Sequence, residues 1–161
     1  ISDSTEPVPP PHARRVAGFV VLAAVTITYL VVLAGLTLGP QPESANGLLR
    51  TLADALAQWP PTAWVTYLML EFVANIALFI PVGVLWVLWL AWGHGSRVTL
   101  AWAWWLAVPV GLALSGAIEI VQASVLADRV ADVRDLISNA LGALLGAGLS
   151  TVIVRWIQRR R

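Results

Sequence analysis

The residues best suited to chemistry lie between Glu119 and Asn139, in a chain that is otherwise mostly apolar. Carboxylates can transfer protons or attract cations, and an arginine can hold a phosphate or another carboxylate. Such groups are costly to place in hydrocarbon, so a polar cluster within a membrane segment is a functional hypothesis by default. The stretch carries Glu119, Gln122, Arg129, Asp132, Arg134, Asp135 and Asn139.

The composition indicates a membrane protein. Of 161 residues, 58% are hydrophobic and 12% are charged, whereas a soluble domain carries about 25% charged residues. The chain has no cysteine, which excludes disulfides, thiolate metal sites and cysteine nucleophiles. All 10 basic residues are arginines, and they are scattered along the chain. Because they form no basic face, we expect no nucleic-acid partner.

Four apolar segments are long enough to cross a bilayer as helices. They are residues 16–38, 64–92, 98–125 and 136–157. Residues 45–59 show 3–4 spacing of leucines with charges between them, which predicts an amphipathic helix on the membrane surface or over the bundle. Residues 1–13 are polar and proline-rich, which predicts a disordered tail. We therefore expect an all-α domain over residues 14–161, with four transmembrane helices and a short interfacial helix between the first two.

The arginines predict the orientation of the four spans. Arg14, Arg15, Arg97 and Arg155 with the terminal arginine triplet fall on one side. The positive-inside bias makes that side cytoplasmic, so both termini are expected there. The other side carries no excess of basic residues. The polar groups of three spans then gather at the extracytoplasmic membrane interface.

Helical spacing groups these polar residues into faces. Glu71 and Asn75 lie four positions apart in the second span. Gly111, Ser115, Glu119 and Gln122 form one stripe of the third span, and Asp132, Asp135 and Asn139 share a face of the fourth with Gly142 and Gly146. We therefore predict one polar pocket made by Glu71, Asn75, Glu119, Gln122, Arg129, Asp132, Asp135 and Asn139.

Three motifs occur in this order on adjacent spans. They are Asn75-x-x-x-Phe79-x-Pro81-x-Gly83, Glu119-x-x-Gln122, and Arg129-x-x-Asp132-x-x-Asp135-x-x-x-Asn139-x-x-Gly142. In order and spacing they resemble the VanZ-like family of bacterial membrane proteins, over residues 36–149. The family takes its name from a protein associated with resistance to the glycopeptide teicoplanin. The resemblance implies a multi-pass protein of the bacterial plasma membrane with a role in the cell envelope or in the glycopeptide response, and it implies no particular reaction.

The pocket has one structural and several functional interpretations. In the structural one, Arg129 pairs with the acids and Asp132 caps the fourth helix. In the first functional one, the pocket binds a membrane lipid, a lipid-linked wall component or a glycopeptide. In the second, the chain is an enzyme in which Glu119 and Asp135 form an acid–base pair, with Arg129 holding phosphate and Asn75 or Asn139 orienting the substrate. No nucleophile motif accompanies that pair.

Two further possibilities remain open at this point. Glu119, Asp132, Asp135 and Asn139 offer oxygen ligands for a divalent cation, although their spacing matches no dedicated metal-binding loop. A transporter or proton path is disfavoured, because the polar residues stop in the outer half of the spans. We expect no cofactor.

Overall fold

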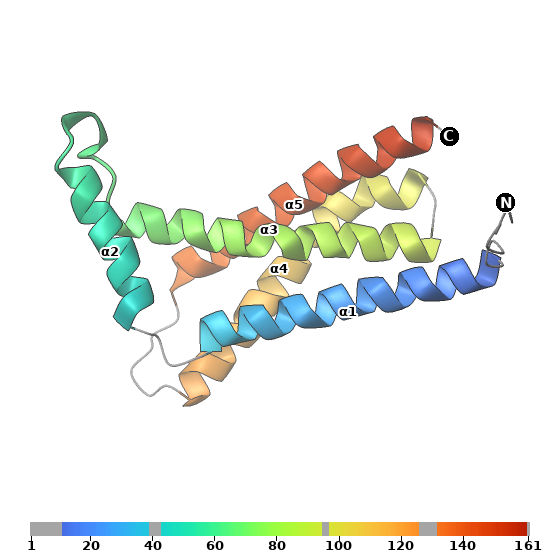
Figure 1. Cartoon of the computed structure of the whole chain (residues 1–161), viewed down its shortest axis with the longest axis horizontal. Helices are drawn as coiled ribbons and strands as arrows, with labels where there is room; N and C mark the ends of the chain where they lie inside the picture. Colours follow the sequence, from blue (N-terminus) through green and yellow to red (C-terminus); the bar gives the residue numbers. More distant parts are fainter. Residues whose placement is uncertain (1–10, 39–42, 95–96, 126–131, 161) are drawn as a thin grey trace, which may run out of the picture.

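The chain folds into a helical bundle. The computed structural model describes residues 11–38, 43–94, 97–125 and 132–160. Within this part, the helices are α1 (Pro11–Leu38), α2 (Glu43–Ala57), α3 (Tyr67–His94), α4 (Arg97–Val125) and α5 (Val133–Arg159), with a short 3₁₀ helix at Pro60–Thr62. Helices α1 and α3 run along the length of the molecule, α4 and α5 run obliquely to them, and α2 lies across one end (Figure 1).

Four helices are long and apolar enough to cross a membrane, over His12–Leu38, Tyr67–Gly93, Trp102–Ser124 and Val133–Arg159. The predicted all-α architecture, with four spans and a shorter helix between the first two, is confirmed. Boundaries differ by a few residues at most ends. The largest shift is at α1, which begins at Pro11, so that residues 11–13 of the predicted tail are helical. Proline suits this place because the first helical N–H has no partner to lose.

The α3–α5 pair is the centre of the bundle, and its backbones touch. A Cβ on Gly146 would overlap the carbonyl oxygen of Ile80, and one on Gly142 would overlap that of Ile76. From the opposite side, a Cβ on Gly83 would overlap the carbonyl oxygen of Ala143. Small residues permit this approach, which is a major source of helix association in lipid. The order of these contacts shows that α3 and α5 run in the same direction.

The remaining spans pack around this pair. Helix α4 runs antiparallel to α5, and a Cβ on its Gly111 would lie 2.8 Å from the Cβ of Ala143. Helix α1 lies at the edge, with only 6% of its span buried against 44% for α5. Polar bonds hold α1 in place: Trp89 Nε1 donates to Thr26 Oγ1 at 3.0 Å, and the Tyr29 hydroxyl donates to the Leu78 carbonyl. Most of the surface of α1 is therefore left to contact lipid.

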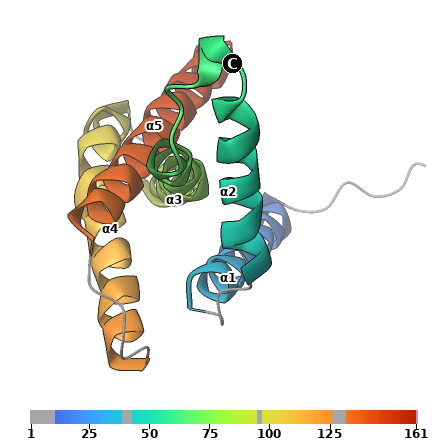
Figure 2. The same cartoon turned by 90° about the vertical axis from the view of Figure 1, so that its left-hand side faces the viewer.

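Helix α2 crosses the end of the bundle at which α3 and α5 begin. In the view along α3, α2 is seen lengthwise and lies across that helix (Figure 2). Ala53 is buried, with 8% of its surface exposed, whereas Leu48 and Leu52 of the same helix are exposed. Helix α2 therefore covers the end of the molecule that carries the last turn of α1 and the first turns of α3 and α5 (Figure 1).

Candidate functional site

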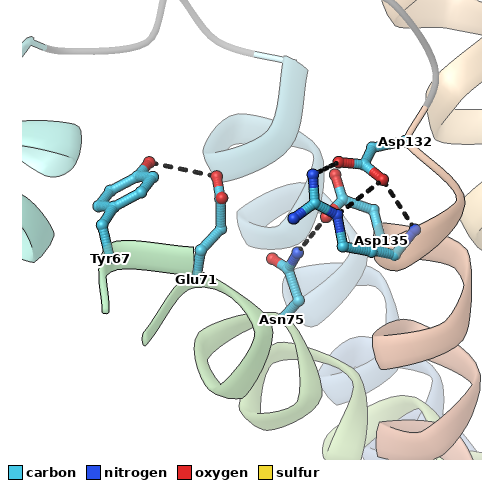
Figure 3. A network of polar contacts seen from close by, with 6 residues as sticks. Tyr67, Glu71, Asn75, Asp132 and Asp135 are labelled. Atoms are coloured by element: carbon cyan, nitrogen blue, oxygen red, sulfur yellow. Dashed lines mark hydrogen bonds and ion pairs between the residues drawn. The ribbon is translucent and has the colours of Figure 1, made fainter. Parts of the chain in front are cut away.

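A polar contact joins α3 and α5 at this end of the bundle. Asn75 Nδ2 donates to Asp135 Oδ1 at 2.8 Å (Figure 3). The two residues are 60 positions apart, and the parallel packing of α3 on α5 brings them to one level. Two of the predicted site residues, from different motifs, are therefore in direct contact. An amide–carboxylate bond also satisfies two polar groups that lipid would leave unsatisfied.

A small cleft opens beside this contact. It is lined by Leu68, Glu71, Phe72, Asp132, Arg134 and Asp135, and it has about 220 Å³ of empty space including the part open to solvent. The space that the centre of a water molecule can reach is about 20 Å³, and one bound water needs roughly 10–15 Å³ on this measure. The cleft is therefore a place for one small polar or charged group, with apolar side chains on its α3 side.

Glu71 points into the site from one turn before Asn75 and has a partner on its own helix. The Tyr67 hydroxyl donates to Glu71 Oε1 at 3.2 Å (Figure 3). The guanidinium carbon of Arg50, on α2, lies 5.5 Å from the centre of the Tyr67 ring, within the range of a cation–π contact. A chain of contacts thus runs from α2 through Tyr67 to a carboxylate of the cleft.

Asp132 is the N-cap of α5, as predicted in the structural interpretation. Its carboxylate accepts from the Arg134 N–H at 2.9 Å and forms an ion pair with the Arg134 guanidinium at 3.1 Å. The backbone bond, reinforced by the side chain of Arg134, holds the pKa of Asp132 below its ordinary value of 3.8. Asp132 is therefore charged at neutral pH, and its negative charge suits the positive end of the helix dipole.

Asn139 lies deeper, between α4 and α5. Its Nδ2 donates to Ser115 Oγ at 2.8 Å, and both side chains are buried. One turn further out along α4, Glu119 lies within electrostatic reach of Asp135 and Asp132. Among the described residues, no hydrogen-bond partner is present for the buried atoms Asn139 Oδ1 and Glu119 Oε1. Neither Glu119 nor Asn139 lines the cleft itself.

Gln122 contacts a different helix. Its Nε2 donates to the Thr37 carbonyl at 2.8 Å and ties the C-terminal end of α4 to the C-terminal end of α1. The geometry thus divides the predicted site residues between three places. Glu71, Asn75, Asp132 and Asp135 lie at or beside the cleft, Glu119 and Asn139 lie at the α4–α5 contact behind it, and Gln122 lies at the α1–α4 contact. Arg129 lies outside the described residues.

The arrangement bears on the alternatives of metal binding and acid–base catalysis. The described part of the chain contains no group of three or more His, Cys, Asp or Glu side chains placed to hold a metal ion. Of the predicted catalytic pair, Asp135 lines the cleft and Glu119 does not. The two members of the predicted acid–base pair therefore lie in different places, and the cleft itself presents charges of both signs.

Sequence reasoning missed two side chains at this site. Tyr67 is not among the predicted pocket residues, although its spacing of four from Glu71 is the signal for a contact on one helix face. Arg134 is not among the predicted pocket residues either, yet it pairs with the cap residue two positions earlier. That pairing depends on where α5 begins, which the hydropathy pattern leaves undetermined to within a few residues.

These features define the class of protein: a multi-pass helical membrane protein whose polar residues gather at one end of a close-packed pair of spans. A family model described as VanZ/LLP1 matches residues 26–155, which is most of the chain. The chain therefore belongs to the VanZ/LLP1 family. No curated protein and no solved structure gives a significant match.

Proposed function

We propose that this protein binds an amphiphilic component of the bacterial cell envelope at the cleft between α3 and α5. The ligand is a membrane lipid, a lipid-linked wall component or a glycopeptide of the teicoplanin type. The orientation that supports this proposal places the cleft on the extracytoplasmic side and both termini in the cytoplasm, because the arginine-rich ends of the spans lie at the opposite end. The family to which the chain belongs supports a teicoplanin-related role.

The observation that carries the proposal is the composition of the cleft. Glu71, Asp132 and Asp135 contribute carboxylates, Arg134 contributes a guanidinium, and Leu68 and Phe72 contribute apolar surface. Charged hydrogen bonds in a partly dry site bind strongly and with defined geometry. The available space admits a small head group or one functional group of a larger molecule, so the body of a wall precursor or of an antibiotic would remain in the leaflet or above it.

Two conservative substitutions test the proposal. Glu71→Gln keeps an oxygen that accepts from Tyr67, and Asp135→Asn keeps one that accepts from Asn75, so each removes charge and retains the observed bond. Asp54→Asn is the matched control, because Asp54 is an exposed acid of α2, at the same end of the molecule, and does not line the cleft. The measurement is the teicoplanin susceptibility of a sensitive bacterial host that expresses each variant.

We expect the wild type and Asp54→Asn to lower susceptibility, and Glu71→Gln and Asp135→Asn to lose this effect at equal abundance in the membrane. Wild-type expression without any shift in susceptibility would refute a glycopeptide role for this protein. A shift that persists in both cleft variants would refute the assignment of the role to the cleft. Loss of membrane abundance in both variants would favour the structural interpretation of the cluster.

A further inference from the structure

Helix α2 presents three different faces, each covering about a third of its circumference. Leu49, Ala53 and Leu56 are turned toward the rest of the protein, and Ala53 is buried. Arg50, Thr51 and Asp54 form an exposed polar face. The third face, here called the leucine stripe, consists of Leu48, Leu52 and Ala55, and its two leucines are 70% and 45% exposed. The apolar surface of α2 is thus about twice as wide as the part that packs on the bundle.

The surroundings of the leucine stripe indicate what covers it. Helix α2 lies across the end of the membrane-spanning bundle, transverse to α3 (Figure 2). This is the orientation of a helix that lies in the plane of the membrane surface. Trp59 and Trp64, in the segment that connects α2 to α3, are 70% and 66% exposed. Exposed tryptophans at the end of a span mark the interface between lipid and water.

The depth of the cleft follows from its neighbours. Met69 and Val73 are exposed on α3, beside the cleft residues Leu68, Glu71 and Phe72. On α5, Val133 and Ile137 are exposed on either side of Arg134 and Asp135 in the sequence. Large apolar side chains therefore face outward at the level of the cleft, which is where a spanning helix meets the hydrocarbon of the leaflet.

From this geometry we infer that the leucine stripe of α2 is inserted into the leaflet at this end of the bundle, so that the cleft opens at the depth of the lipid head groups. The partner of the stripe is phospholipid, and the polar face of α2 stays in water. Arg50 then links the inserted helix to Tyr67 and through it to Glu71. A ligand reaches the cleft sideways, from within the leaflet. The placement of α2 holds whichever ligand the cleft binds.

The chain has no cysteine, so single cysteines can report on each face. Leu48→Cys, Leu52→Cys, Thr51→Cys, Asp54→Cys and Leu68→Cys are each labelled with an environment-sensitive fluorophore in full-length protein, one copy per phosphatidylcholine nanodisc. Quenching by nitroxide attached near the top of the acyl chains is compared with quenching by aqueous iodide. We expect the labels at positions 48, 52 and 68 to be quenched several-fold more by the lipid nitroxide, and those at 51 and 54 several-fold more by iodide.

The placement of α2 is overturned if positions 48 and 52 respond to iodide as position 54 does. It is also overturned if they are shielded from both quenchers, because protein would then cover the stripe. Nitroxide quenching at 48 with iodide quenching at 68 would refute sideways entry. Leu48 is mostly exposed, so its replacement leaves packing intact, and it decides the outcome if the Leu52 variant fails to fold.

Discussion

Gly146 is the position at which the packing of α3 on α5 can be tested most sharply. In Gly146→Ala the new Cβ would overlap the carbonyl oxygen of Ile80 and lie 2.8 Å from its carbonyl carbon. These atoms belong to the backbone of α3, so no flexible side chain can move aside. The two helices must separate, and a radial gap of about 0.5–1 Å already forfeits a quarter to a half of each van der Waals contact.

The expected cost follows from two opposing effects. Replacing glycine by alanine inside a helix favours folding by up to about 1 kcal/mol. Overpacking a close contact costs typically 1–3 kcal/mol, occasionally more, and a rigid backbone obstacle places Gly146→Ala at the upper end. We therefore expect a net loss of about 1–2 kcal/mol in the free energy of unfolding, by the difference of these two effects.

Gly116→Ala is the matched control. Gly116 lies inside α4, and no heavy atom lies within 4 Å of the Cβ that alanine would add. This variant gains the helical preference without the overlap, so it should be neutral or slightly more stable than the wild type. The assay is reversible unfolding in mixed detergent–SDS micelles, followed by tryptophan fluorescence. Equal stability of Gly146→Ala and Gly116→Ala would refute backbone contact between α3 and α5.

Other consequences can be measured with the same preparations. Ser115→Ala should lower the free energy of unfolding by about 0.5–2 kcal/mol, because it leaves the buried Asn139 amide without its partner. The double variant Ser115→Ala/Asn139→Leu should recover most of that loss. Additive losses from the two substitutions would contradict the contact. Because the pKa of Asp132 is lowered, its charged cap stabilises α5 fully at pH values above the ordinary pKa of 3.8. This contribution is lost at lower pH, as the carboxylate becomes protonated. Asp132→Asn retains an acceptor but has no carboxylate to protonate, so its free energy of unfolding should fall less than that of the wild type as the solution is acidified. An equal fall in both proteins would show that Asp132 does not cause it. A periplasm-active reporter fused after residue 127 should be active and one fused after residue 95 inactive; the reverse pattern would put the cleft in the cytoplasm.

The fold was predictable because hydropathy acts over whole segments. The third span was expected at residues 98–125 and occurs at Arg97–Val125, and the short helix was expected at 45–59 and occurs at Glu43–Ala57. Spacing also identified the packing face of α5, since Asn139, Gly142 and Gly146 are all buried. Helical periodicity assigns each residue to one face of its helix, and the residues of that face determine whether it packs against other helices.

Partners were harder to predict, because spacing on one helix does not say which helix lies opposite. Ser115 and Gln122 belong to one predicted stripe of α4, yet Ser115 contacts α5 and Gln122 contacts α1. The contact of Arg50 with Tyr67 depends on how α2 crosses the bundle, which is a tertiary property. Most polar residues of the site could thus be predicted from the sequence. Which of them line the cleft and which join helices depends on the tertiary packing, so it could not.

The binding role of the cleft is tested most directly by equilibrium binding to purified protein in nanodiscs, with a lipid-linked wall precursor and with teicoplanin as separate probes. The wild type and Asp54→Asn should bind at least one probe with equal affinity. Asp135→Asn, with unchanged thermal stability, should bind that probe about tenfold more weakly, which corresponds to about 1.4 kcal/mol. Equal affinity of Asp135→Asn and the wild type would contradict a binding role for the cleft. Failure of the wild type to bind either probe would contradict both the wall-precursor and the glycopeptide assignments.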